Sequence, residues 1–212
     1  MIALFATIRN MKIITLSGVD GSGKSTQLGL LQKKLESQGK KVAYFHAVEF
    51  SLANKLFSKN STESGTAKKA ITEASFFSLL LRKAILPVDL LRFHLHFQAL
   101  YKQGFDYILS DRYFYDTFIN IEYLAKKRIA VPAVVFCLLI KPDTAFYIDL
   151  PPEVIMTRER APEQGLEYLQ DKAKLFKNKV SPWDLTVIDG NRDQASAFQD
   201  IVNQIEGDSV KE

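Results

Sequence analysis

Cysteine is almost absent from this sequence of 212 residues, which contains only Cys137. One cysteine cannot form a disulfide within the chain, and the three histidines do not supply the Cys/His spacing of a zinc site. A disulfide scaffold and a zinc-stabilised domain are therefore excluded. We expect a protein of a reducing compartment, the cytoplasm.

Long hydrophobic segments are also missing. The longest apolar run, residues 129–140, contains Pro132 and stops before Lys141, so it is too short to cross a bilayer core of about 30 Å. Residues 1–10 have neither the charged start nor the cleavage site of a signal peptide. We therefore expect no membrane partner.

Glycine and proline are sparse, at 10 and 7 residues, and no linker rich in Gly, Pro or Ser divides the chain. A single domain over residues 12–206 is predicted, between an N-terminal extension (1–11) and a polar tail (207–212). The charge excess is small as well, since 28 Lys and Arg minus 24 Asp and Glu gives +4. This balance suits a small anionic substrate and falls short of a nucleic-acid binder, so no nucleic-acid partner is expected.

The chain does contain a regular alternation of apolar strands and helices. Short apolar runs predict strands at 13–17, 42–46, 107–110, 145–150 and 185–188, and longer helical patterns separate them. Near-continuous apolar strands are typical of a parallel sheet that helices cover on both faces. We therefore predict an α/β fold with a doubly wound, five-stranded parallel sheet.

The helix that follows Lys24 is the clearest, because Leu28, Leu31 and Leu35 form an apolar stripe that ends before Gly39.

A second helical region, residues 67–103, contains Pro87, which predicts two helices with a bend or break near Leu86. A cluster of lysines near residue 175 predicts a solvated helix face. These lysines are Lys172, Lys174, Lys177 and Lys179.

Residues 18–25, GVDGSGKS, fit the phosphate-loop pattern G-x-x-x-x-G-K-[ST] and lie between a predicted strand and a predicted helix. Glycines let the backbone N–H groups converge on phosphate oxygens, and the helix N-terminus favours the same anion. Lys24 is expected at the β and γ phosphates, Ser25 on Mg²⁺ and Thr26 near the α-phosphate. ATP and Mg²⁺ are therefore the predicted cofactors. The predicted nucleotide-binding residues are Gly18, Asp20, Gly21, Ser22, Gly23, Lys24, Ser25 and Thr26.

A second motif, Ser110-Asp111-Arg112-Tyr113, falls at the carboxyl end of a predicted strand, where open α/β sheets bind ligands. Asp111 is expected to reach the Mg²⁺ shell, and the planar guanidinium of Arg112 suits an anionic acceptor. A GTPase is disfavoured, because residues 178–181 lack the aspartate of the guanine-binding N-K-x-D string.

With GVDGSGKST, SDRY and then KPD before FYIDL, the chain resembles the thymidylate kinase family. The resemblance implies a P-loop NTPase fold with a short lid at about 152–166, and transfer of the ATP γ-phosphoryl group to a nucleoside monophosphate, most simply dTMP to dTDP. It places Asp20 at the acceptor sugar and Arg112 at the acceptor phosphate, and it implies a homodimer. Because Gly21 replaces the loop arginine of some members, Arg158 or Arg160 of the lid is expected to be catalytic, with Arg158 favoured.

The acceptor pocket departs from the family. Members usually carry an arginine in an R-E-P or P-E-R string after the second strand, whereas residues 47–50 read AVEF and no arginine occurs between residues 11 and 82. A serine and a Tyr-Gln pair are replaced by Asp116 and by Asn120-Ile121. Arg82 and Arg92 lie near the position of another acceptor arginine. The residues predicted to bind the acceptor are Asp20, Glu49, Arg92, Arg112 and Tyr113.

Two alternatives remain open on the sequence alone. One is a kinase of the same fold that uses a different nucleotide or small-molecule acceptor, and the other is a nucleotide-binding regulatory module with little turnover. Acceptor-dependent ATP consumption separates them.

Overall fold

A computed structural model describes residues 11–54, 76–125, 132–158 and 161–209. Its centre is one sheet of five parallel strands in the order β2-β3-β1-β4-β5. The strands are β1 (Lys12–Ser17), β2 (Val42–Phe45), β3 (Tyr107–Asp111), β4 (Thr144–Asp149) and β5 (Thr186–Asp189). The predicted α/β fold with a five-stranded parallel sheet is confirmed.

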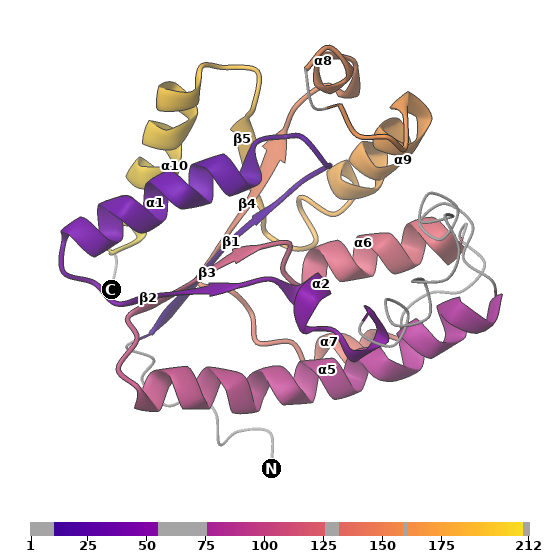
Figure 1. Ribbon diagram of the computed structural model, residues 1–212, viewed down its shortest axis with the longest axis horizontal. Helices are drawn as coiled ribbons and strands as arrows, with labels where there is room; N and C mark the ends of the chain where they lie inside the picture. The colour runs from indigo at the N-terminus through magenta and orange to yellow at the C-terminus, as the bar shows by residue number, and fades with distance from the viewer. Residues whose placement is uncertain (1–10, 55–75, 126–131, 159–160, 210–212) are drawn as a thin grey trace.

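Helices cover both faces of this sheet (Figure 1). On one face lie α1 and α10, and on the other lie α5, α6 and α9. Period-two alternation along β1 explains the two layers, because Ile14 and Leu16 pack with the α1 side while Ile13 packs with the opposite core. The helices are α1 (Lys24–Ser37), α2 (Ala47–Phe50), α5 (Phe76–Lys102), α6 (Phe114–Ala125), α7 (Ala133–Phe136), α8 (Pro152–Met156), α9 (Leu166–Lys177) and α10 (Gln194–Ser209).

The strand order places β1 in the middle of the sheet, between β3 and β4. Strands β2 and β3 lie on one side of β1, and strands β4 and β5 lie on the other. All five strands are parallel, and their carboxyl ends therefore meet at one edge. The phosphate loop follows β1 there, and Asp111 ends β3 beside it. This switch point is where an α/β sheet binds ligands.

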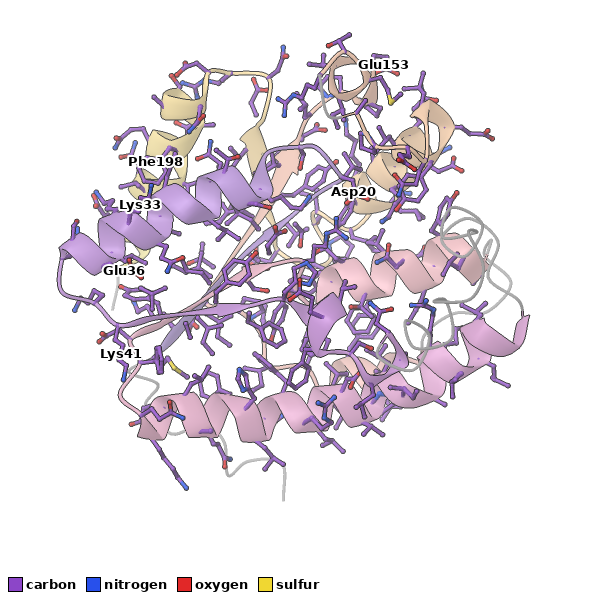
Figure 2. The ribbon with its side chains drawn as sticks, in the orientation of Figure 1. Asp20, Lys33, Glu36, Lys41, Glu153 and Phe198 are labelled. Atoms are coloured by element: carbon purple, nitrogen blue, oxygen red, sulfur yellow. The ribbon has the colours of Figure 1, made fainter. Side chains whose placement is uncertain are left out.

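Helix α1 begins at Lys24 and ends at Ser37, as its pattern predicts. Leu28, Leu31 and Leu35 are buried, while Lys33 and Glu36 are exposed (Figure 2). Past the helix end, Gly39 has φ +77°, a left-handed conformation that suits glycine.

Helix α5 does not break near Leu86; it runs as one helix from Phe76 to Lys102 with Pro87 inside it. The prediction of two helices was wrong, and residues 67–75 lie outside the described ones. Proline removes one internal hydrogen bond, but buried side chains on both sides of it hold the helix against the core. These are Leu79, Leu86, Leu90, Phe93 and Leu100.

Both predicted domain ends shift slightly. Met11, which we assigned to the extension, is fully buried, so the folded domain includes it. At the other end α10 continues to Ser209, so residues 207–209 of the predicted polar tail belong to this helix. Residues 1–10 and 210–212 lie outside the described structure. No helix in the described ranges is long and apolar enough to span a membrane.

Truncation of Leu31 tests the packing of α1 on the sheet. Leu31 is 1% exposed in the α1 core, so Leu31→Ala should lower the free energy of unfolding by about 2–5 kcal/mol. Urea denaturation measures the change, with Lys33→Ala on the exposed side of α1 as the matched control. Equal effects of the two substitutions would show that this stripe is not core.

Candidate functional site

The phosphate loop turns sharply between β1 and α1. Gly21 and Gly23 have φ +83° and +99°, in the left-handed region. A Cβ added at Gly21 would stand 2.7 Å from Ile155 Cγ2, so only glycine lets α8 approach the loop this closely. Both glycines therefore shape the loop, and Gly21 also allows α8 to pack on it.

Lys24 lies at the start of α1 with its ammonium buried beneath the loop. It donates hydrogen bonds to the carbonyl oxygens of Gly18 (3.0 Å) and Val19 (2.8 Å). Burial lowers the pKa of Lys24, and the charges of Asp116 and Asp111 oppose that shift. The predicted phosphate-binding lysine is thus held against the loop.

Ser25 and Asp111 meet at the junction of α1 and β3. The Ser25 hydroxyl donates to Asp111 Oδ2, while Asp111 Oδ1 is buried and has no hydrogen-bond partner among the described residues. A hydroxyl beside an unpaired carboxylate oxygen fits a hard cation such as Mg²⁺. No cluster of three His, Cys, Asp or Glu within the described ranges provides a metal site on its own, so phosphates and water would supply the other ligands.

Arg112 follows β3 and crosses to the phosphate loop. Its backbone is left-handed, with φ +60°, and its guanidinium is paired with Asp20. Burial would raise the pKa of Asp20, but Arg112, Lys172 and Lys24 outweigh it and hold that pKa below its usual value. Figure 2 shows Asp20 between the start of α1 and helix α9. Two of the five residues predicted to bind the acceptor, Asp20 and Arg112, are therefore brought together.

Helix α9 adds two further groups to the pair of Asp20 and Arg112, and the four side chains form one cluster. The Tyr168 hydroxyl donates to Asp20 Oδ2 (3.4 Å), and Lys172 Nζ donates to the Tyr168 hydroxyl (3.0 Å). The prediction that Lys172 lies on a solvated face was wrong, because this side chain is only 6% exposed. Lys174 and Lys177 are exposed as predicted.

Asp116 lies in the first turn of α6 and is buried under the loop. Its Oδ2 accepts a hydrogen bond of 2.6 Å from Ser17. Burial raises the pKa of Asp116 to about 6, and the charge of Lys24 and the Ser17 hydrogen bond partly oppose the shift. The serine that the family resemblance leads one to expect is thus replaced by a titratable group.

A large cavity of about 590 Å³ opens beside the loop. Asp20, Gly21, Arg112, Tyr168 and Lys172 line the end where it reaches the loop. The rest of its wall comes from α2 and the residues after it, from α5 and α6, and from Pro162 and Gln164 before α9. The polar residues in this part of the wall are Ser51, Asn54, Arg82, Asp89, Thr117, Asn120 and Gln164. The volume suits a nucleotide-sized ligand.

Three residues predicted to bind the acceptor do not line this cavity. Arg92 binds Asp89 (2.7 Å) and stacks over Phe50, and the Tyr113 hydroxyl is buried on the carbonyl of Ile140. Glu49 lies on α2, also outside the cavity wall. Arg82 lines the cavity instead, where it donates to Asn54. The acceptor-binding roles of Arg92, Tyr113 and Glu49 therefore remain predictions, and none of these three residues lines the cavity.

A smaller cavity of about 130 Å³ lies on the next residues of the same loop. Ser22, Gly23 and Thr26 line it, together with Arg158. Arg158 Nη1 also donates a hydrogen bond to the carbonyl oxygen of Gly21 (2.7 Å). Arg158 follows α8, so its guanidinium reaches the loop at the position where Gly21 replaces the loop arginine of some family members. Arg160 lies outside the described residues.

Two members of the site, Asp116 and Lys172, were not among the predicted site residues. For Lys172 a signal existed: it falls inside the apolar stripe of α9, whereas Lys174 and Lys177 fall outside it. The buried stripe consists of Tyr168, Leu169, Lys172, Ala173 and Phe176. For Asp116 the signal was its place in the family pattern, where members carry a serine of the acceptor pocket, but nothing in the sequence predicted its burial.

Comparison with known proteins gives a consistent result. A family model described as thymidylate kinase matches residues 16–183. A thymidylate kinase of Thermosipho africanus is 30% identical over 208 residues, covering 91% of this chain and 96% of that protein. A probable thymidylate kinase of Thermococcus kodakarensis is 29% identical over 178 residues, covering 79% of each chain. The solved structure of thymidylate kinase from Candida albicans has a TM-score of 0.60 at 20% identity, covering 95% of this chain and 94% of that one, and shows the same fold.

The raised pKa of Asp116 predicts a pH-dependent stability. Because the folded protein holds this proton more tightly than the unfolded chain, Asp116 favours folding below about pH 4 and loses that contribution as the pH rises through about 6. Asp116→Asn does not titrate, so its free energy of unfolding should rise relative to wild type by roughly 1–3 kcal/mol between about pH 4 and pH 7. Urea unfolding across this range measures the difference. Asp171→Asn, on the exposed face of α9, is the control, and parallel curves for Asp116→Asn and wild type would contradict the shift.

Proposed function

Because the chain belongs to the thymidylate kinase family, we propose that it transfers the γ-phosphoryl group of ATP to dTMP and releases dTDP. The observation that best supports this proposal is that adjacent residues of the phosphate loop line two different cavities. Asp20 and Gly21 line the large cavity, and Ser22 and Gly23 line the small one. A donor and an acceptor bound in these cavities would meet at the loop, as direct transfer requires.

On the donor side, we assign the β and γ phosphates to the loop amides and Lys24. Ser25 and Asp111 would hold Mg²⁺, and the bound ion would neutralise negative charge on the phosphates. Arg158 lies near enough to the loop to add a further positive charge where negative charge develops. No covalent intermediate is needed, because positioning and electrostatics account for this type of transfer.

On the acceptor side, we assign Arg112 to the acceptor phosphate and Asp20 to its orientation. Negative charge on Asp20, Asp116 and Asp111 raises the pKa of Arg112 against the effect of burial, so its guanidinium stays charged. The nucleoside would occupy the part of the cavity lined by Asn54, Arg82 and Asn120. This wall departs from the family pattern at Asn120, and the departure favours a second candidate function in which another nucleoside monophosphate is the acceptor.

The exposed thiol of Cys137 supports a cytoplasmic site of action, since an accessible free cysteine persists best where thiols stay reduced.

An acceptor panel tests the function directly. ADP release from ATP and Mg²⁺ should be fastest with dTMP among dTMP, dUMP, UMP, CMP, AMP, GMP, thymidine and no acceptor. Lys24→Ala should reduce dTMP-dependent release by roughly a hundredfold or more, because it removes the ammonium that neutralises the phosphates. Faster release with another nucleotide would identify that one as the substrate. Release that does not depend on any acceptor would contradict a kinase.

We also propose that the protein is a homodimer joined through α5. The outer face of this helix exposes an apolar stripe at intervals of three and four residues, and such a stripe is a usual site of helix–helix association. Its members are Leu80, Ala84, Val88, Leu91 and Leu95.

Light scattering tests the dimer. Wild type should have twice the chain mass, and Leu95→Glu should shift it toward the monomer, because it places a charge in the stripe. Val134→Glu is the matched control, since Val134 is 70% exposed on α7 and Leu95 is 69% exposed. A monomeric wild type, or equal effects of both substitutions, would contradict an α5 interface.

A further inference from the structure

Lys172 is a buried cation that has no carboxylate partner among the residues that the structure describes. In the described part of the chain its ammonium makes one hydrogen bond, to the neutral Tyr168 hydroxyl, and lies 4.9 Å from the centre of the same ring. No carboxylate of those residues lies at ion-pair distance from it. An ammonium has three N–H donors, and burying it without an anion is unfavourable. An anionic ligand would satisfy this group.

The ammonium also lines the large cavity at the end that touches the phosphate loop. Lys172 is linked through the Tyr168 hydroxyl to Asp20, which lies in the loop and pairs with Arg112. In a direct transfer the acceptor phosphate must lie at this end, because the donor γ-phosphate is held by the loop. The nucleoside then points away, toward α5 and α6.

The sequence supplies a reason for a cation here. Residues 47–50 carry no arginine, although the family resemblance leads one to expect an acceptor-binding arginine there. Arg92 is bound to Asp89 and does not line the cavity. Among the described residues the cations that line it are Arg82, Arg112 and Lys172, and only the last two lie beside the loop.

From this geometry we propose that Lys172 is a further acceptor-binding residue, which donates hydrogen bonds to the phosphate of the nucleoside monophosphate opposite Arg112. The inference rests on the proposed function and adds Lys172 to the residues that bind the acceptor phosphate. Lys172 supplies from α9 the positive charge that residues 47–50 lack. Because α9 follows the lid segment, the same contact ties acceptor binding to the lid side of the cavity.

The charges around Lys172 give this contact a pH dependence. Burial lowers its pKa to about 8; Asp20 of the loop and Asp116 of α6 favour the ammonium, while Arg112 and Lys24 disfavour it. Only the protonated form donates three hydrogen bonds and attracts the phosphate dianion. Affinity for the acceptor should therefore fall as the pH rises past about 8.

Calorimetric titration of dTMP and of thymidine separates phosphate binding from a structural role. Lys172→Met keeps the stem and removes the charge, so the Kd for dTMP should rise roughly ten- to a hundredfold, the loss expected for charge-assisted hydrogen bonds. The Kd for thymidine, which has no phosphate, should not change. Lys172→Arg should retain most of the dTMP affinity and abolish its fall above about pH 8. Lys174→Met, on the exposed side of α9, is the control and should match wild type.

The outcomes divide clearly. An unchanged Kd for dTMP in Lys172→Met overturns the proposal, and so does a parallel loss of dTMP and thymidine affinity, which would show that Lys172 only shapes the cavity. If wild type turns over dTMP while either result is obtained, the assignment of Lys172 fails and the proposed function stands. If wild type neither binds nor turns over dTMP, the proposed function itself fails.

Discussion

Three carboxylates and three cations meet where β1 passes into the phosphate loop, and their mutual attraction ties together the loop, the end of β3, and helices α1, α6 and α9. They are Asp20, Asp111, Asp116, Lys24, Arg112 and Lys172. Each is buried or half-buried, so removing one partner leaves an uncompensated charge in a poorly solvated place. The apolar layers on either side of the sheet hold the elements that deliver these six groups to one point.

This charge balance also explains the opposite pKa shifts of neighbouring groups. The pKa of Asp20 falls because Arg112 lies in contact with it, whereas the pKa of Asp116 rises because burial outweighs the attraction of Lys24. Asp20 lines the cavity that we assign to the acceptor, and Asp116 lies beneath the loop. Asp20 can thus respond to a ligand in the cavity, while the fully buried Asp116 favours the charged form of Lys24.

The parts that the sequence predicts well are those fixed by local pattern. Glycine spacing and the strand before it predict the phosphate loop, and a leucine stripe predicts α1 with its end near Gly39. What local pattern misses depends on packing between distant segments. Pro87 is tolerated because the core holds both halves of α5, and Arg92 is taken up by Asp89 and Phe50, so it never reaches the cavity. Neither fact can be obtained from residue types alone.

Lys172 and Asp116 are best understood together. A lysine at residue 172 without a new carboxylate would place one more positive charge near Lys24 and Arg112. Repulsion among the three cations would then disfavour the charged form of each. A carboxylate at residue 116, where the family pattern has serine, offsets that charge, since Asp116 favours the protonated form of both Lys24 and Lys172. We therefore interpret the lack of an arginine at residues 47–50 and the presence of Asp116 and Lys172 as linked. In our assignment Lys172 of α9 joins Arg112 in providing positive charge for the acceptor, and Asp116 offsets the added charge near the phosphate loop.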